Sequence, residues 1–252
     1  MTEFVESGKN FNRKGKDYSI YSPILRVNIL PIGEELFENM TSKMIRALVF
    51  ILAFSIAGYA MVQYGVLQAS DAGLVSFKLQ KPDFELQPWV YVLYIHIFTA
   101  IFALIIGPFQ LFIKPTHTRR RWHRLFGYGY VFSIVVSGIV SVYLSLFATG
   151  GWISSLGFMS LDVLWVGTTI TATRKIMAKD IHAHKEWMLR SYALTFSAVT
   201  LRIFLAPLAI LLGDFEAAFR VVAWLCWIPN LLVMEAIIAG MRQRLNRYKD
   251  GI

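Results

Sequence analysis

Long apolar stretches separated by short polar segments dominate the pattern of this sequence. Each stretch holds about 20 or more predominantly apolar residues, enough to cross the hydrocarbon core of a bilayer as a helix. The six stretches occupy residues 44–66, 89–113, 126–147, 154–174, 188–212 and 219–241. The pattern therefore predicts an all-α fold: a polytopic membrane protein built as a bundle of six transmembrane helices.

Charge is distributed unevenly between the segments that connect these stretches. Of the 25 lysines and arginines, 21 lie near the N-terminus, in the loops around 114–124 and 174–190, or after residue 241. Only Lys78, Lys81 and Arg220 lie in the other loops, and Arg202 lies inside a stretch. Because cytoplasmic loops of membrane proteins are enriched in basic residues, both termini are predicted to be cytoplasmic. Labelling of introduced cysteines in intact cells tests this orientation.

The net charge of +9 then reflects membrane orientation, which argues against a nucleic-acid site.

The chain is predicted to divide into three parts: a cytoplasmic N-terminal segment at 1–43, a transmembrane domain at 44–241 and a basic cytoplasmic tail at 242–252. Part of the N-terminal segment is apolar enough to lie at the membrane interface. The single cysteine, Cys226, excludes an intramolecular disulfide and a cysteine-based metal cluster.

A stripe of polar and small residues marks the fifth stretch and the segment before it. On a helix, alternating steps of four and three residues share one face. These steps join His184, Met188, Ser191, Thr195, Ala198 and Arg202. At about 1.5 Å per residue the stripe is roughly 27 Å long, so one helix face is predicted to connect a boundary histidine with an arginine in the membrane.

Three ionisable residues, His96, Asp162 and Arg202, come from three different stretches. Counted from the outer helix ends, all three are predicted to lie in the outer half of the membrane. A charge there favours a partner, so Asp162 is expected to be the counter-ion of Arg202, with His96 as a third member. A structural ion pair that fixes helix packing is the alternative to a functional site.

Glu235 completes the predicted buried polar cluster and lies in the inner third of the last stretch. Pairing with Arg190 or His123 is the favoured interpretation of this carboxylate, and proton transfer is the alternative.

His123 and His184 are predicted to lie at one depth, near the cytoplasmic boundary. Two histidines on different helices are the axial ligands of a b-type haem, and Arg124 or Arg190 would then meet the haem propionates. Two interfacial histidines that contact headgroups or backbone are the favoured interpretation, and haem ligation is the alternative.

Small residues suggest close helix contacts elsewhere in the chain. Tyr130, Ser133, Ser137 and Ser141 share one face of the third stretch and are interpreted as packing residues. Gly107 and Pro108 are predicted to kink the second stretch, because proline removes a backbone donor.

The chain resembles the bacterial predicted-membrane-protein family called domain of unknown function 2306. The resemblance covers residues 89–205 and rests on His96, Gly107-Pro108-Phe109-Gln110, His123-Arg124-Leu-Phe-Gly127-Tyr-Gly-Tyr130, Asp180-Ile-His-Ala-His184-Lys-Glu-Trp187-Met188-Leu-Arg190-Ser191-Tyr192 and the Arg202 region. It implies a multi-pass protein of the bacterial cytoplasmic membrane, and the family name supplies no activity.

The function class predicted first is a membrane protein with a buried polar site that binds haem b, a quinone or another small ligand. A proton-coupled small-molecule transporter is the alternative, with His96, Asp162, Arg202 and Glu235 as relay or substrate groups. A structural subunit of a membrane complex is the third. The lipid bilayer is the one partner common to all three.

Overall fold

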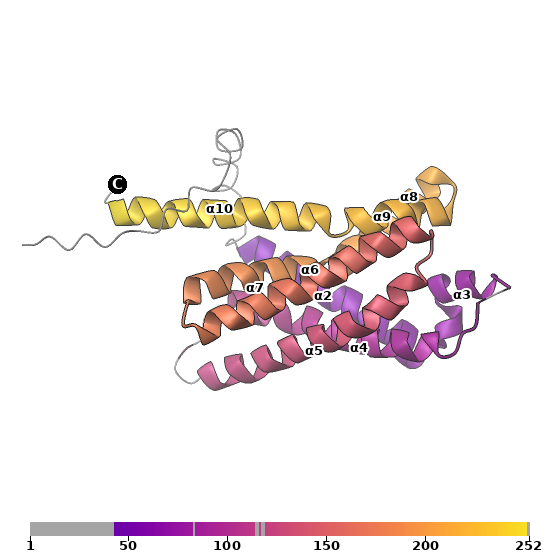
Figure 1. The fold of residues 1–252 in the computed structure, drawn as a ribbon, viewed down its shortest axis with the longest axis horizontal. Coiled ribbons are helices and arrows are strands. Elements are labelled where there is room, and N and C mark those ends of the chain that lie inside the picture. Colours follow the sequence, from indigo (N-terminus) through magenta and orange to yellow (C-terminus); the bar gives the residue numbers. More distant parts are fainter. Residues whose placement is uncertain (1–42, 83, 114–115, 117–118, 251–252) are drawn as a thin grey trace, which may run out of the picture.

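The computed structural model describes residues 43–82, 84–113, 116 and 119–250, and every regular element within these ranges is helical. Figure 1 shows the helices running along one common direction as a bundle. The elements are α2 (Lys43–Met61), η1 (Val62–Val66), η2 (Ala69–Asp71), α3 (Gly73–Leu79), α4 (Trp89–Phe112), α5 (Arg120–Leu146), α6 (Trp152–Met177), α7 (Ile181–Thr195), α8 (Ser197–Leu212), α9 (Phe215–Leu225) and α10 (Ile228–Asp250). The predicted N-terminal segment lies outside the described residues, apart from Lys43.

Six helical stretches in the described ranges are long and apolar enough to cross a membrane, as the sequence pattern predicts. They are Lys43–Val66, Trp89–Phe112, Arg120–Leu146, Trp152–Met177, Ile181–Leu212 and Phe215–Arg247. The all-α, six-span fold is therefore confirmed. Several spans extend beyond their apolar runs, because a helix continues into the interface where long basic side chains reach water.

Large apolar side chains cover the outside of the bundle. Phe132 and Ile139 on α5 are more than 60% exposed, and so are Val163 on α6 and Ile210 on α8. Contiguous exposure of this kind is unfavourable in water and is what a lipid-facing surface requires.

The fifth span consists of two consecutive helices, α7 and α8, where the sequence pattern predicts one. α7 ends at Thr195, Phe196 forms a turn, and α8 begins at Ser197. Two hydroxyls next to the break bond to the backbone. Thr195 donates to the Ser191 oxygen at 2.9 Å, and Ser197 donates to the Leu194 oxygen at 2.6 Å. Such back-bonding competes with the helical ladder and bends transmembrane helices.

The sixth span is also divided, between α9 and α10, and Asn230 connects the break to its surroundings. Pro229 lies in the first turn of α10, where a missing backbone donor costs little. The Asn230 amide donates to the Cys226 oxygen at 3.0 Å, and it is hydrogen-bonded to the Thr200 hydroxyl on α8. A polar side chain thus supplies donors where the helical backbone is interrupted.

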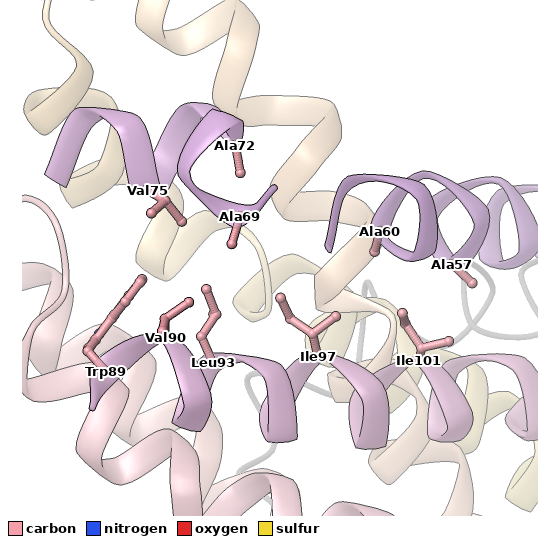
Figure 2. Close-up of a cluster of buried hydrophobic side chains, with 10 residues drawn as sticks. All are labelled: Ala57, Ala60, Ala69, Ala72, Val75, Trp89, Val90, Leu93, Ile97 and Ile101. Atoms are coloured by element: carbon pink, nitrogen blue, oxygen red, sulfur yellow. The ribbon is translucent and has the colours of Figure 1, made fainter. Parts of the chain in front are cut away.

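The short helices between the first two spans pack over the beginning of α4. Figure 2 shows the Trp89 side chain rising from α4 toward Val75 on α3, while small alanines of α2 face Ile97 and Ile101. Trp89 is only 3% exposed. This position keeps Trp89 away from lipid headgroups, because α3 covers the side that would otherwise face them.

We call the end of the bundle that carries α3 the α3 end. The start of α4, the end of α5, the starts of α6 and α9 and the end of α8 lie there as well (Figure 1). The charge distribution predicts that this end faces outward. At the opposite end α10 continues as a helix through 242–250, the residues predicted as a basic tail.

Candidate functional site

A cavity of about 260 Å³ lies between helices of the α3 half of the bundle. Apolar side chains of α2, α4, α6 and α8 form most of its wall. The polar residues in its lining are Tyr64, Lys78, Trp89, His96, Ser141, Ser145, Thr149, Asp162, Trp165, Thr195, Ser197 and Arg202. An apolar cavity with a few polar groups is the usual form of a small-molecule site.

His96 is fixed by two serines of α5. Its Nδ1 lies 2.9 Å from the Ser137 hydroxyl and 2.6 Å from the Ser141 hydroxyl. Ser141 also lies next to the Asp162 carboxyl on α6. His96, Ser141 and Asp162 thus bring three helices together at one point. Ser137 and Ser141 therefore orient a histidine as well as allowing close helix packing.

Arg202 lines the same cavity without pairing with Asp162. Its Nη1 donates to the Ala198 oxygen one turn earlier on α8, at 2.8 Å. No ion pair within 4 Å joins it to Asp162 in the described part of the chain, which corrects the predicted contact. The carboxyl group instead lies next to Ser141, so cation and carboxylate face the cavity separately.

Next to the cavity, a hydroxyl network joins α5, α6 and α7 around Tyr130, which is fully buried. The Tyr130 hydroxyl lies 3.0 Å from both the Ser191 and the Thr195 hydroxyls. Trp165 Nε1 donates to Thr195 at 2.8 Å, and Thr169 lies 2.7 Å from Ser191. Each of these side chains has a partner, as buried polar groups require, so the network fixes the helices around the cavity.

Glu235 lies apart from the other three members of the predicted cluster. It accepts two hydrogen bonds from Arg190, from Nε at 2.5 Å and from Nη2 at 2.8 Å. Arg190 is buried and also stacks on the Trp187 ring, with 4.6 Å between its Cζ and the ring centroid. The expected pairing of Glu235 with Arg190 is confirmed.

His123 and His184 lie in the half of the bundle opposite to the cavity. The two side chains are close enough to interact electrostatically. His184 Nδ1 is hydrogen-bonded to the Ala172 oxygen at 2.9 Å, which leaves its Nε2 for another partner. Arg124 is exposed, whereas Arg190 is engaged by Glu235. Within the described ranges, no group of three or more metal-ligating side chains occurs.

Lys78 is the group at the cavity that sequence reasoning missed. It is 6% exposed, donates to the Phe147 oxygen, and lies over the rings of Phe84 and Trp89. Burial lowers the pKa of Lys78 to about 8; the positive charge of Lys81 adds to this effect and Glu216 opposes it. A lysine in an outer loop carries no sequence signal of burial, since the loop's packing is a tertiary property.

This fold and this cavity define a polytopic α-helical membrane protein with a polar site inside the bundle. A family model described as predicted membrane protein (DUF2306) matches residues 93–238, more than half of the chain, and the protein belongs to that family. No curated protein and no solved structure matches the chain.

Proposed function

We propose that this membrane protein binds a lipophilic small molecule with a hydrogen-bond-accepting head group, and that a quinone is the best specific candidate. One observation carries the proposal: a largely apolar cavity is lined by His96, Asp162 and Arg202 from three helices. Quinones need an apolar slot for the ring and donors for their carbonyl oxygens, and this lining offers both.

Arg202 supplies the donors for such a head group. Its planar guanidinium carries five N–H groups, and a single contact, to Ala198, uses only part of this capacity. The His96 ring is held through Nδ1 by Ser137 and Ser141, which directs the opposite edge of the ring away from α5. Side chains that are held in place in this way lower the entropy cost of binding.

Titration of a short-chain benzoquinone into purified protein tests the proposal, with quenching of tryptophan fluorescence as the signal. Replacement of Arg202 by methionine is expected to weaken binding about tenfold or more, because hydrogen bonds from a charged group contribute about 1.5–3 kcal/mol. Arg121→Met, an exposed position at the far end of α5, is the control and should bind as the unmodified protein does. Equal affinity of all three proteins would refute the site and favour the transporter or structural-subunit alternatives.

A b-type haem at His123 and His184 is the second candidate. The observation that favours it is the contact of His184 Nδ1 with the Ala172 oxygen, since haem-ligating histidines commonly bind the metal with one nitrogen while the other donates to a carbonyl. Because Arg190 is bound to Glu235, Arg124 is the remaining partner for the haem propionates. Protein purified from haem-replete cells should show a Soret band that either His→Ala substitution removes, and colourless protein would eliminate this candidate.

The membrane is proposed to be the bacterial cytoplasmic membrane, with both termini in the cytoplasm. The bias of 21 basic residues against 3 supports this orientation. In that orientation the cavity lies toward the outer face, and the histidine pair lies toward the cytoplasm.

A further inference from the structure

The part of the cavity nearest the α3 end is lined by three donor side chains that are almost completely buried. Lys78 is 6% exposed, and Trp89 and Thr149 are each 3% exposed. Among the described residues, neither Trp89 Nε1 nor the Thr149 hydroxyl has a hydrogen-bond partner. A buried polar group without a partner costs about 1–3 kcal/mol, so two of them at one end of a cavity would be stabilised by an acceptor group bound there.

Lys78 gives this group of donors its charge. The ammonium group donates to the Phe147 oxygen at the end of α5, and it lies 5.3 Å from the centroid of the Trp89 ring. An ammonium group has three donors, so the contact with Phe147 does not use all of them. Because the Trp89 side chain rises from α4 toward α3, the helix that carries Lys78, the ammonium and the indole belong to one place in the fold (Figure 2).

The charges that line the cavity do not balance. Lys78 and Arg202 are cations, and among the described residues Asp162 is the only carboxylate in the lining. An uncompensated charge in an apolar environment is unfavourable, and a bound anion removes the imbalance. The Trp89 indole N–H and the Lys78 ammonium at the α3 end donate hydrogen bonds and cannot accept them. Both therefore suit an acceptor, and an anion best of all.

We propose that the α3 end of the cavity is an anion subsite, in which Lys78, Trp89 and Thr149 bind the acidic group of a lipophilic ligand. This inference rests on the proposed function of the cavity. It narrows the ligand class to lipophiles that carry one acidic group, which includes hydroxylated quinones. The apolar part of the ligand then extends along α4 toward His96, about 10 Å further along the helix axis at 1.5 Å per residue.

The test compares 1-naphthoate with 1-naphthamide, two probes of nearly the same shape of which only the first is charged. Both are titrated into the full-length protein in nanodiscs of phosphatidylcholine, where no anionic headgroup competes. Naphthoate is expected to bind about tenfold or more tightly than naphthamide at pH 7, as a charge-assisted contact implies. Lys78→Met should remove this preference. Lys81→Met is the matched control and should keep it, because Lys81 is half exposed and bound to Glu216.

The pH dependence gives a second measurement on the unmodified protein. The pKa of Lys78 is about 8. The charged groups around it are Lys81, two residues after α3, and Glu216 and Arg220 on α9. The ammonium is charged below that pH and neutral above it, so naphthoate affinity should fall between pH 7 and 9 while naphthamide affinity stays constant. The preference for naphthoate should be lost when phosphatidylglycerol is added to the nanodiscs, because its anionic headgroup competes for the subsite.

Equal affinities for the two probes on the unmodified protein would overturn the anion subsite. This result needs no variant, so a folding defect of Lys78→Met does not obscure it. A benzoquinone that still binds through Arg202 would then leave the cavity proposal standing. Failure of all three probes to bind would refute the cavity as a ligand site and the subsite with it.

Discussion

Replacement of Gly107 by alanine is expected to destabilise the protein by about 1–3 kcal/mol, the usual cost of overpacking a core. A Cβ atom at this position would overlap the Tyr192 ring. Tyr192 is 4% exposed and packs in the central apolar cluster, so its ring has no free space to enter. The improved helix propensity of alanine, worth up to about 1 kcal/mol, is too small to offset the overlap.

Thermal unfolding of purified protein, followed by circular dichroism, measures this effect. Gly167→Ala on α6 is the matched control, because a Cβ there meets nothing within 4 Å. It should be neutral or slightly stabilising. The penalty of Gly107→Ala should also shrink in a Tyr192→Ala background, where the overlapping ring is absent. Equal melting temperatures for the two glycine variants would show that Tyr192 does not restrict Gly107.

This role of Gly107 illustrates what the sequence could and could not predict. Gly107 next to Pro108 suggests a kink, and the proline is indeed inside α4, yet the helix continues to Phe112. The glycine is needed because a side chain from α7, 85 positions further along the chain, packs against its Cα. Contacts between distant segments have no local signature in a single sequence.

The six spans were predictable because length and hydropathy are local properties, and the bilayer fixes the length that a helix needs. The breaks at Phe196 and around Cys226 were not, because apolar residues continue across both. Side chains near these breaks bond to backbone groups, those of Thr195 and Ser197 at the first break and that of Asn230 at the second.

The depth of a residue in the membrane predicted which side chains line the cavity. The signs of their charges did not predict which of them contact each other. Counting residues from the helix ends gave His96, Asp162 and Arg202 a common half of the bilayer, and all three line one cavity. Opposite charge then suggested a direct contact between Asp162 and Arg202. The rotation of each helix about its own axis decides such contacts, and in the structure Asp162 lies next to Ser141 while Arg202 bonds within α8.

Loss of either member of the Arg190–Glu235 pair is the second large effect that we expect. The pair joins α7 to α10 through two hydrogen bonds, and it is asymmetric: the Arg190 side chain is 9% exposed and the Glu235 side chain 45%. Glu235→Leu leaves a buried guanidinium without its carboxylate. We expect a loss of about 1.5–3 kcal/mol, typical of hydrogen bonds to a charged group, since the exposed carboxylate keeps the effect below that of a fully buried pair.

A double-mutant cycle with Arg190→Leu and Glu235→Leu separates this coupling from lost packing, because the double variant contains no stranded charge. The double variant should therefore be more stable than the sum of the two single losses predicts. Arg242 and Glu186 form the matched control, a second bidentate contact between α7 and α10 in which the Arg242 side chain is 46% exposed. Its coupling should be smaller, since water competes for the half-exposed Arg242 and since Glu186, at 15%, is less deeply buried than Arg190, at 9%. If the two cycles give the same coupling, burial of Arg190 adds nothing to the pair; a larger coupling for Arg190 and Glu235 shows that burial strengthens this contact between α7 and α10.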